Sequence, residues 1–158
     1  RRSVLARRRM PGGLATWGRA AVEKRWGLTL RALSRKAAEH PEEWRGFLKE
    51  FAREVVRRPR ASLISSEPVL TGRPHEDAYL AAVAEELARR FGWKTPSWTM
   101  KPERICYRPH FGNAPEGMKP YLIQVAPPSF RRRGLFVDPD EVSDLLDKAA
   151  REIESLEP

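Results

Sequence analysis

Residues 74–92, PHEDAYLAAVAEELARRFG, form the stretch that decides the fold. Apolar side chains recur there at the spacing of one helical face: Leu80, Val83, Ala84, Leu87 and Phe91. Gly92 follows the last of them, and glycine readily takes the left-handed conformation that ends many helices. The pattern therefore predicts a helix near 75–91 that buries its apolar face in a core.

A second helix is predicted upstream, near 41–58. Pro41 suits the first helical turn, and the two glutamates that follow suit the positive end of the helix dipole. Apolar residues then recur at helical spacing until Pro59, which cannot continue the helix. Because only a short connection separates this helix from the one near 75–91, we expect the two to pack together.

The clearest helix signal of the chain lies at its acidic end, near 139–156. Asp138 is placed to cap this helix and Pro139 to occupy its first turn, and an apolar stripe follows. Residues 138–158 hold 2 Lys or Arg against 8 Asp or Glu, whereas residues 1–60 hold 17 against 6. We therefore expect the acidic helix to fold back on the basic half, with a partner-binding face as the alternative.

The remaining segments carry weaker signals. Interrupted apolar stripes predict helices near 14–26 and 29–38, the second with Thr29 as its cap, and a helical turn is predicted within 60–66. The prolines of residues 93–120 predict an irregular stretch.

Two short apolar runs, near 121–126 and 135–137, predict strands, because prolines bound the first and both are rich in β-branched or aromatic residues. The predicted fold is mainly α with a small β element. We expect residues 14–158 to form a single helical domain and residues 1–13 to be a flexible basic arm.

The formal net charge of the 158-residue chain is +9, which favours an anionic partner, either nucleic acid or an acidic protein. One cysteine, Cys106, and the absence of an 18-residue apolar run indicate a cytoplasmic protein without a membrane span. An arginine-rich transit peptide is a less favoured alternative. The first residue is Arg1 rather than Met, so a longer protein with an upstream DNA-binding segment is also an open alternative.

Catalytic, metal and cofactor signals are weak. Cys106, His40, His75 and His110 do not show the paired spacing of a zinc site, and the glycines match no phosphate-binding loop. Adjacent carboxylates such as Glu85 with Glu86 fall at helix starts or on predicted solvent faces, where solubility and the helix dipole explain them. We therefore expect no metal, no cofactor and no enzyme activity, unless Cys106 proves to lie beside a histidine.

Arginine clusters are the better candidates for binding, since a guanidinium pairs with phosphate or carboxylate through two hydrogen bonds. The alternative interpretation of these clusters is an ordinary charged surface that is solvated and binds nothing. The predicted nucleic-acid contacts are Arg7, Arg8, Arg9, Arg57, Arg58 and Arg60. The predicted partner-protein contacts are Arg131, Arg132 and Arg133 with the neighbouring aromatics Phe130 and Phe136.

Residues 60–137 also contain a characteristic order of short motifs. They are Ile64-Ser65-Ser66-Glu67-Pro68, Asp77-Ala78-Tyr79-Leu80-Ala81-Ala82, Pro96-Ser97-Trp98, Pro102-Glu103-Arg104 and Ser129-Phe130-Arg131-Arg132-Arg133-Gly134-Leu135-Phe136-Val137. This half of the chain resembles the C-terminal region of actinobacterial helix-turn-helix regulators that are encoded beside nucleotidyltransferase-like toxins. The helix-turn-helix itself is not evident in residues 14–40.

The resemblance implies an antitoxin-type role without catalysis, in which the chain binds and neutralises a partner protein, for instance such a toxin. An arginine-rich patch that faces an acidic active-site cleft would block the entry of substrate. The alternative is a nucleic-acid-binding protein, a transcriptional repressor or ribonucleoprotein component, that uses the basic residues 1–60.

Overall fold

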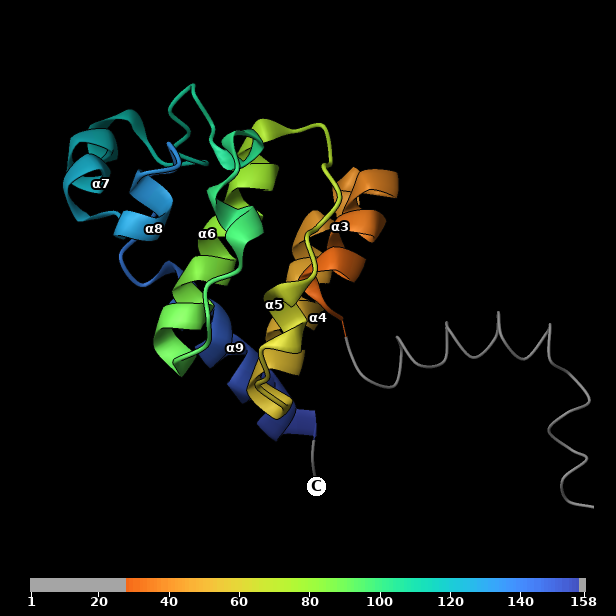
Figure 1. The fold of residues 1–158 in the computed structure, drawn as a ribbon. Coiled ribbons are helices and arrows are strands. Elements are labelled where there is room, and N and C mark those ends of the chain that lie inside the picture. Colours follow the sequence, from red (N-terminus) through yellow and green to blue (C-terminus); the bar gives the residue numbers. More distant parts are fainter. Residues whose placement is uncertain (1–27, 157–158) are drawn as a thin grey trace, which may run out of the picture.

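A computed structural model of the chain describes residues 28–156, and this part is mostly helical (Figure 1). The predicted basic arm at 1–13 and the predicted helix at 14–26 lie outside the described residues. The α-helices are α3 (Leu30–Glu39), α4 (Trp44–Arg57), α5 (Ser62–Ser65), α6 (Pro74–Phe91), α7 (Lys119–Val125), α8 (Pro128–Arg131) and α9 (Glu141–Leu156). Short 3₁₀ turns are η1 (Pro41–Glu43), η2 (Ser97–Met100), η3 (Pro102–Arg104) and η4 (Glu116–Met118).

Helix α6 runs through the middle of the fold, with α3, α4 and α5 on one side and α7 and α8 on the other (Figure 1). The helix predicted near 75–91 is thus confirmed, and Gly92 ends it in the left-handed conformation, with φ of 73°. The burial is wider than the predicted stripe, because Ala78, Ala81 and Ala82 are also fully buried. Their small side chains let α8 and the turns η2 and η3 pack closely around α6.

The predicted helix at 41–58 begins with the turn η1 and continues as α4. Helix α4 packs most extensively against α9, so the acidic helix does fold back on the basic half of the chain. An ion pair of 2.9 Å between Arg53 and Glu152 joins the two helices. An edge contact between Trp44 and Tyr79, with ring centroids 6.0 Å apart, links α4 to α6.

Helix α9 begins at Glu141, two residues later than predicted. Residues Pro139 and Asp140 form a turn instead, in which the carboxylate of Asp138 accepts a hydrogen bond of 2.9 Å from the backbone N–H of Asp140. Asp138 therefore stabilises the approach to the helix rather than its first turn.

The two smaller helical predictions are confirmed. Thr29 caps α3, since its hydroxyl accepts a hydrogen bond of 3.1 Å from the backbone N–H of Ala32. Helix α5 lies within the turn predicted at 60–66. The stretch from Trp93 to Gly117 is irregular apart from its 3₁₀ turns, and the indole N–H of Trp98 fixes it to the core by donating to the carbonyl of Ile64.

The predicted strands were wrong. Residues 121–126 lie mainly in α7, whose first turn holds Pro120, and residues 135–137 form only an isolated bridge between Leu135 and His110. The described residues contain no sheet. A lone strand leaves its backbone hydrogen bonds unpaired, whereas a helix satisfies them internally, so the short apolar run becomes helical where it has no partner strand. None of the described helices has the length and apolar character needed to cross a membrane.

Candidate functional site

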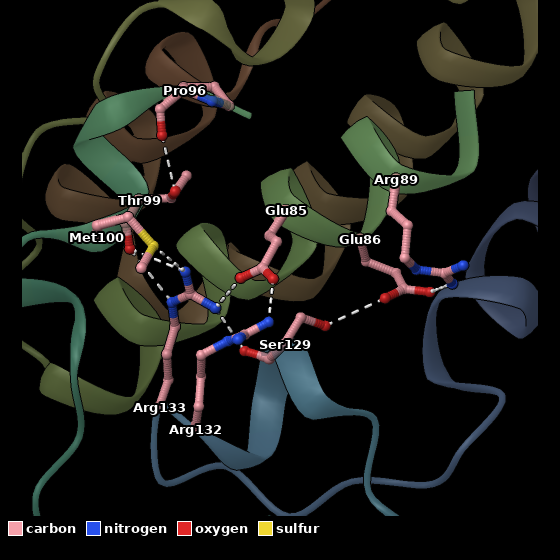
Figure 2. Close-up of polar contacts among 9 residues, drawn as sticks. All are labelled: Glu85, Glu86, Arg89, Pro96, Thr99, Met100, Ser129, Arg132 and Arg133. Atoms are coloured by element: carbon pink, nitrogen blue, oxygen red, sulfur yellow. Dashed lines mark hydrogen bonds and ion pairs between the residues drawn. The ribbon is translucent and has the colours of Figure 1, made fainter. Parts of the chain in front are cut away.

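The predicted arginine cluster at residues 131–133 is divided between the surface and the core. Arg133, only 2% exposed, points inward from the end of α8 toward α6 (Figure 2). Its guanidinium donates hydrogen bonds of 2.6 Å to the carboxylate of Glu85, 2.6 Å to the carbonyl of Ser129 and 2.9 Å to the carbonyl of Thr99. Burial lowers the pKa of the Arg133 guanidinium, and the hydrogen bond to Glu85 partly offsets this effect.

The carboxylate of Glu85 also forms an ion pair with Arg132, so one carboxylate of α6 binds two arginines of the cluster (Figure 2). The next residue of the same helix, Glu86, accepts a hydrogen bond of 3.1 Å from the hydroxyl of Ser129 and pairs with Arg89. These contacts fasten α8 to α6. We refer to Glu85, Glu86, Ser129, Arg132 and Arg133 as the α6–α8 junction.

Three residues at or beside the junction lie elsewhere than predicted. Arg133 was expected at a partner surface but is occupied inside the fold, and Phe130 is fully buried against Tyr79, with ring centroids 5.4 Å apart. Glu86 was expected on a solvent face, yet it is 9% exposed. The apolar pattern of a helix marks its core face. Ser129 and Arg133, the partners that bury Glu86 and Glu85, follow more than 40 residues later and leave no local signal.

The other three predicted partner contacts remain accessible. Arg132 is exposed although it pairs with Glu85. Arg131 is exposed and donates a weak hydrogen bond of 3.4 Å to the carbonyl of Gln124 at the end of α7. Phe136 is half-buried and stacks on Phe111, with ring centroids 5.0 Å apart.

Two of the predicted nucleic-acid contacts also form ion pairs within the fold. Arg58 and Arg60 both pair with the buried carboxylate of Glu54, at 3.5 Å and 2.8 Å, so they close the end of α4. Arg57 is exposed. Arg7, Arg8 and Arg9 lie outside the described residues.

Helix α7 presents an apolar surface that the sequence did not predict, because a strand was expected there. Met118, Tyr121 and Ile123 are 43%, 48% and 47% exposed, and we call them the α7 face. Leu122, between the last two, is 6% exposed and turns inward. On a helix, residues two positions apart lie on different sides, so Tyr121 and Ile123 emerge on either side of the buried Leu122. This arrangement could be recognised only from the fold.

A cleft of about 730 Å³ opens between α4, the start of α6, α9 and the loop after His110. His75 and His110 stack at its side, with ring centroids 4.3 Å apart. The hydroxyl of Tyr79 donates a hydrogen bond of 2.7 Å to the carboxylate of Glu141. The cleft is lined mainly by aromatic and charged side chains, which include Trp44, Phe111 and Phe136.

Two groups of this cleft have shifted pKa values. Burial, followed by the neighbouring charge and hydrogen bond of Glu141, raises the pKa of the Tyr79 hydroxyl well above its usual value. Burial and the nearby His75 lower the pKa of the His110 imidazole. Shifted groups of this kind often mark binding or active sites when they share one cleft.

Cys106 is buried, and its thiol donates to the carbonyl of Arg108 at 3.1 Å. Within residues 28–156, no hydrogen bond joins this thiol to a histidine, because His110 stacks on His75 instead. The metal-ligand groups that converge in this part of the chain are those of His40, Glu42 and Glu43, and all three are exposed. Exposed acidic groups meet in this way without a metal, so they indicate no site.

No protein-family profile, curated protein or solved structure matches the chain.

Proposed function

We propose that the chain is a cytoplasmic, non-enzymatic binding protein of the antitoxin type, which docks on a partner protein through the α7 face and the adjacent Arg131. The observation that carries this proposal is the exposure of Tyr121 and Ile123, each about half open to solvent on a short helix at the edge of the fold. Covering the remaining area of both side chains would contribute on the order of 1–2 kcal/mol to binding.

The surroundings of α7 indicate the chemistry of the partner. Arg131, which is exposed, lies at the C-terminal end of α7, and Lys119 lies in the first turn of that helix. Aromatic, apolar and arginine side chains that lie together are the groups that most often dominate binding at protein interfaces. A partner surface with an apolar centre and an acidic rim would complement this region.

Such docking would neutralise an enzyme whose active-site cleft is acidic, because a positively charged face over that cleft blocks a substrate electrostatically. A nucleotidyltransferase-like toxin is the partner class that the sequence resemblance suggests. The proposal that residues 1–60 bind nucleic acid has less support, since Arg58 and Arg60 both pair with Glu54 within the fold.

The test is native purification of the tagged full-length chain from its own host, followed by identification of what remains bound in about 0.5 M salt, where exposed charge contacts are largely screened. The wild type is compared with the double variant Tyr121→Ser/Ile123→Ser and with the control Leu156→Ser, which removes an exposed apolar residue from the end of α9. One stoichiometric protein retained by the wild type and the control, and lost from the double variant, is the expected result.

Two outcomes would contradict the proposal. Recovery of nuclease-sensitive nucleic acid in place of a protein would favour the alternative function. A protein partner that binds the double variant as well as the wild type would place the docking surface elsewhere.

A further inference from the structure

We propose that the cleft between α4, α6 and α9 binds a small aromatic anion, that is, a planar ring system that carries a carboxylate, sulfonate or phosphate group. Met118 borders both this cleft and the α7 face, but Tyr121 and Ile123, which carry the docking proposal, do not line the cleft. Binding of a small molecule here goes beyond the docking of a protein. Its volume of about 730 Å³ lies within the range of roughly 300–1,000 Å³ that small-molecule pockets occupy. It is also the place where the shifted pKa values of Tyr79 and His110 occur together.

The walls of the cleft suit a planar ring. Trp44 of α4 and Tyr79 of α6 meet edge to face, and Phe111 and Phe136 stack on one another from two other segments. Aromatic rings favour stacked or edge contacts with a further ring, and each such contact adds to the gain from burying apolar area. A flat aromatic ligand therefore gains more from these walls than an aliphatic one of equal size.

The cations at the cleft indicate the charge of the ligand. Arg45 and Lys49 lie one turn apart on α4, and Lys148 approaches from α9. All three are exposed, and within residues 28–156 none of them forms an ion pair. Cations from two helices thus border one opening without a carboxylate partner of their own.

Most carboxylates that line the cleft are already engaged. Glu141 accepts from Tyr79, Asp138 accepts from the backbone of Asp140, and Glu76 pairs with Arg73 at 2.7 Å. Asp144 alone among the lining carboxylates has no side-chain hydrogen bond or ion pair in the described part of the chain. Glu141, Asp138 and Asp144 keep their negative charge, so the lining carries both signs. The local positive group is the pair Arg45 and Lys49 on α4, which an anionic group can contact at the opening.

The histidine pair supplies polar contacts for the ring. A neutral imidazole offers one donor and one acceptor, and the lowered pKa of His110 favours this form. Heteroatoms of a bound ring could exchange hydrogen bonds with this pair while the acidic group contacts Arg45 or Lys49.

Two matched dyes test the proposal: 1-anilinonaphthalene-8-sulfonate, an aromatic anion, and N-phenyl-1-naphthylamine, the same ring system without the sulfonate. Both are titrated into the folded full chain, and binding is followed by fluorescence and calorimetry. We expect the sulfonate to bind about tenfold more tightly than the neutral dye, which is the effect of one charge-assisted contact. We expect Arg45→Gln/Lys49→Gln to abolish this preference and to leave the affinity for the neutral dye unchanged.

The control variant Arg35→Gln/Lys94→Gln removes the same charge from two exposed positions that do not line the cleft, and it should keep the preference. Phe111→Leu/Phe136→Leu should weaken both dyes. Urea unfolding of each variant verifies that it is folded.

Equal binding of the two dyes, or an equal loss in the cleft and control variants, would overturn the proposal. The same holds if neither dye binds the wild type. Dye binding that disappears in Tyr121→Ser/Ile123→Ser but persists in the cleft variants would place the dye on the α7 face. Retention of a protein partner by the cleft variants keeps this test independent of the proposed docking function.

Discussion

The α6–α8 junction and helix α7 are close in the sequence but use their side chains in opposite ways. At the junction, Arg133 is 2% exposed and its guanidinium is surrounded by acceptors. On α7, Tyr121 and Ile123 remain about half exposed. Arg133, from a charged cluster that the sequence marks as a surface, thus belongs to the core, whereas two residues of the apolar run that it marks as a buried strand lie at the surface.

The contrast follows from the cost of burial. A guanidinium can leave water only when carboxylate and carbonyl groups replace its hydration, and Glu85, Ser129 and Thr99 supply those groups. Leaving part of an apolar side chain exposed carries a much smaller penalty. We therefore expect substitutions at the junction to lower the stability of the fold more than substitutions at the exposed positions of α7.

The largest effect is expected at Glu85. Glu85→Ala would leave Arg133 buried without its carboxylate, which costs about 3–5 kcal/mol of unfolding free energy. Urea denaturation monitored by circular dichroism measures this loss. Glu154→Ala is the matched control, because Glu154 is exposed on α9 and we expect a change within about 0.5 kcal/mol. Equal effects of the two substitutions would show that the junction does not stabilise the fold.

A smaller effect is expected at Gly134, directly after the junction. Its φ is +80°, and an added Cβ would lie 2.0 Å from the carbonyl oxygen of Cys106. Gly134→Ala should destabilise the chain by about 2–3 kcal/mol, because the backbone would be strained and the backbone at Cys106 would have to move.

The control for this prediction is another glycine. Gly46 lies inside α4, and an added Cβ would meet nothing within 4 Å. Gly46→Ala should stabilise the chain by about 0.5–1 kcal/mol, because alanine favours the helix. Thermal and urea unfolding of both variants show whether each substitution raises or lowers the free energy of unfolding. A stabilising Gly134→Ala would contradict the geometry of the turn.

Local patterns predicted the parts of the fold that depend on neighbouring residues. The cap at Thr29, the end of α6 at Gly92 and the apolar faces of α4 and α9 are signals of this kind. The run at 121–126 could not be assigned in the same way, because a short apolar segment becomes strand or helix according to whether a partner strand exists.

The candidate sites depended on contacts between distant residues. Glu85 and Arg133 are 48 residues apart, and His75 and His110 are 35 apart, so neither pair leaves a spacing that can be recognised. The density of arginine at 131–133 predicts a binding surface, but density alone does not distinguish a buried ion pair from an exposed patch.

The smallest effect on stability is expected on α7 itself. Tyr121→Ser/Ile123→Ser should lower the free energy of unfolding by about 1–2 kcal/mol, since tyrosine, isoleucine and serine have similar helix propensities and only about half of each lost side chain is buried. Leu122→Ser, at the buried position between them, should cost about 2–4 kcal/mol. Urea unfolding of these variants separates the two faces of one helix. If the double variant were as unstable as Leu122→Ser, the α7 face would be part of the core, and its exposure would no longer support a docking surface; a small loss that accompanies the loss of the partner protein would assign Tyr121 and Ile123 to binding alone.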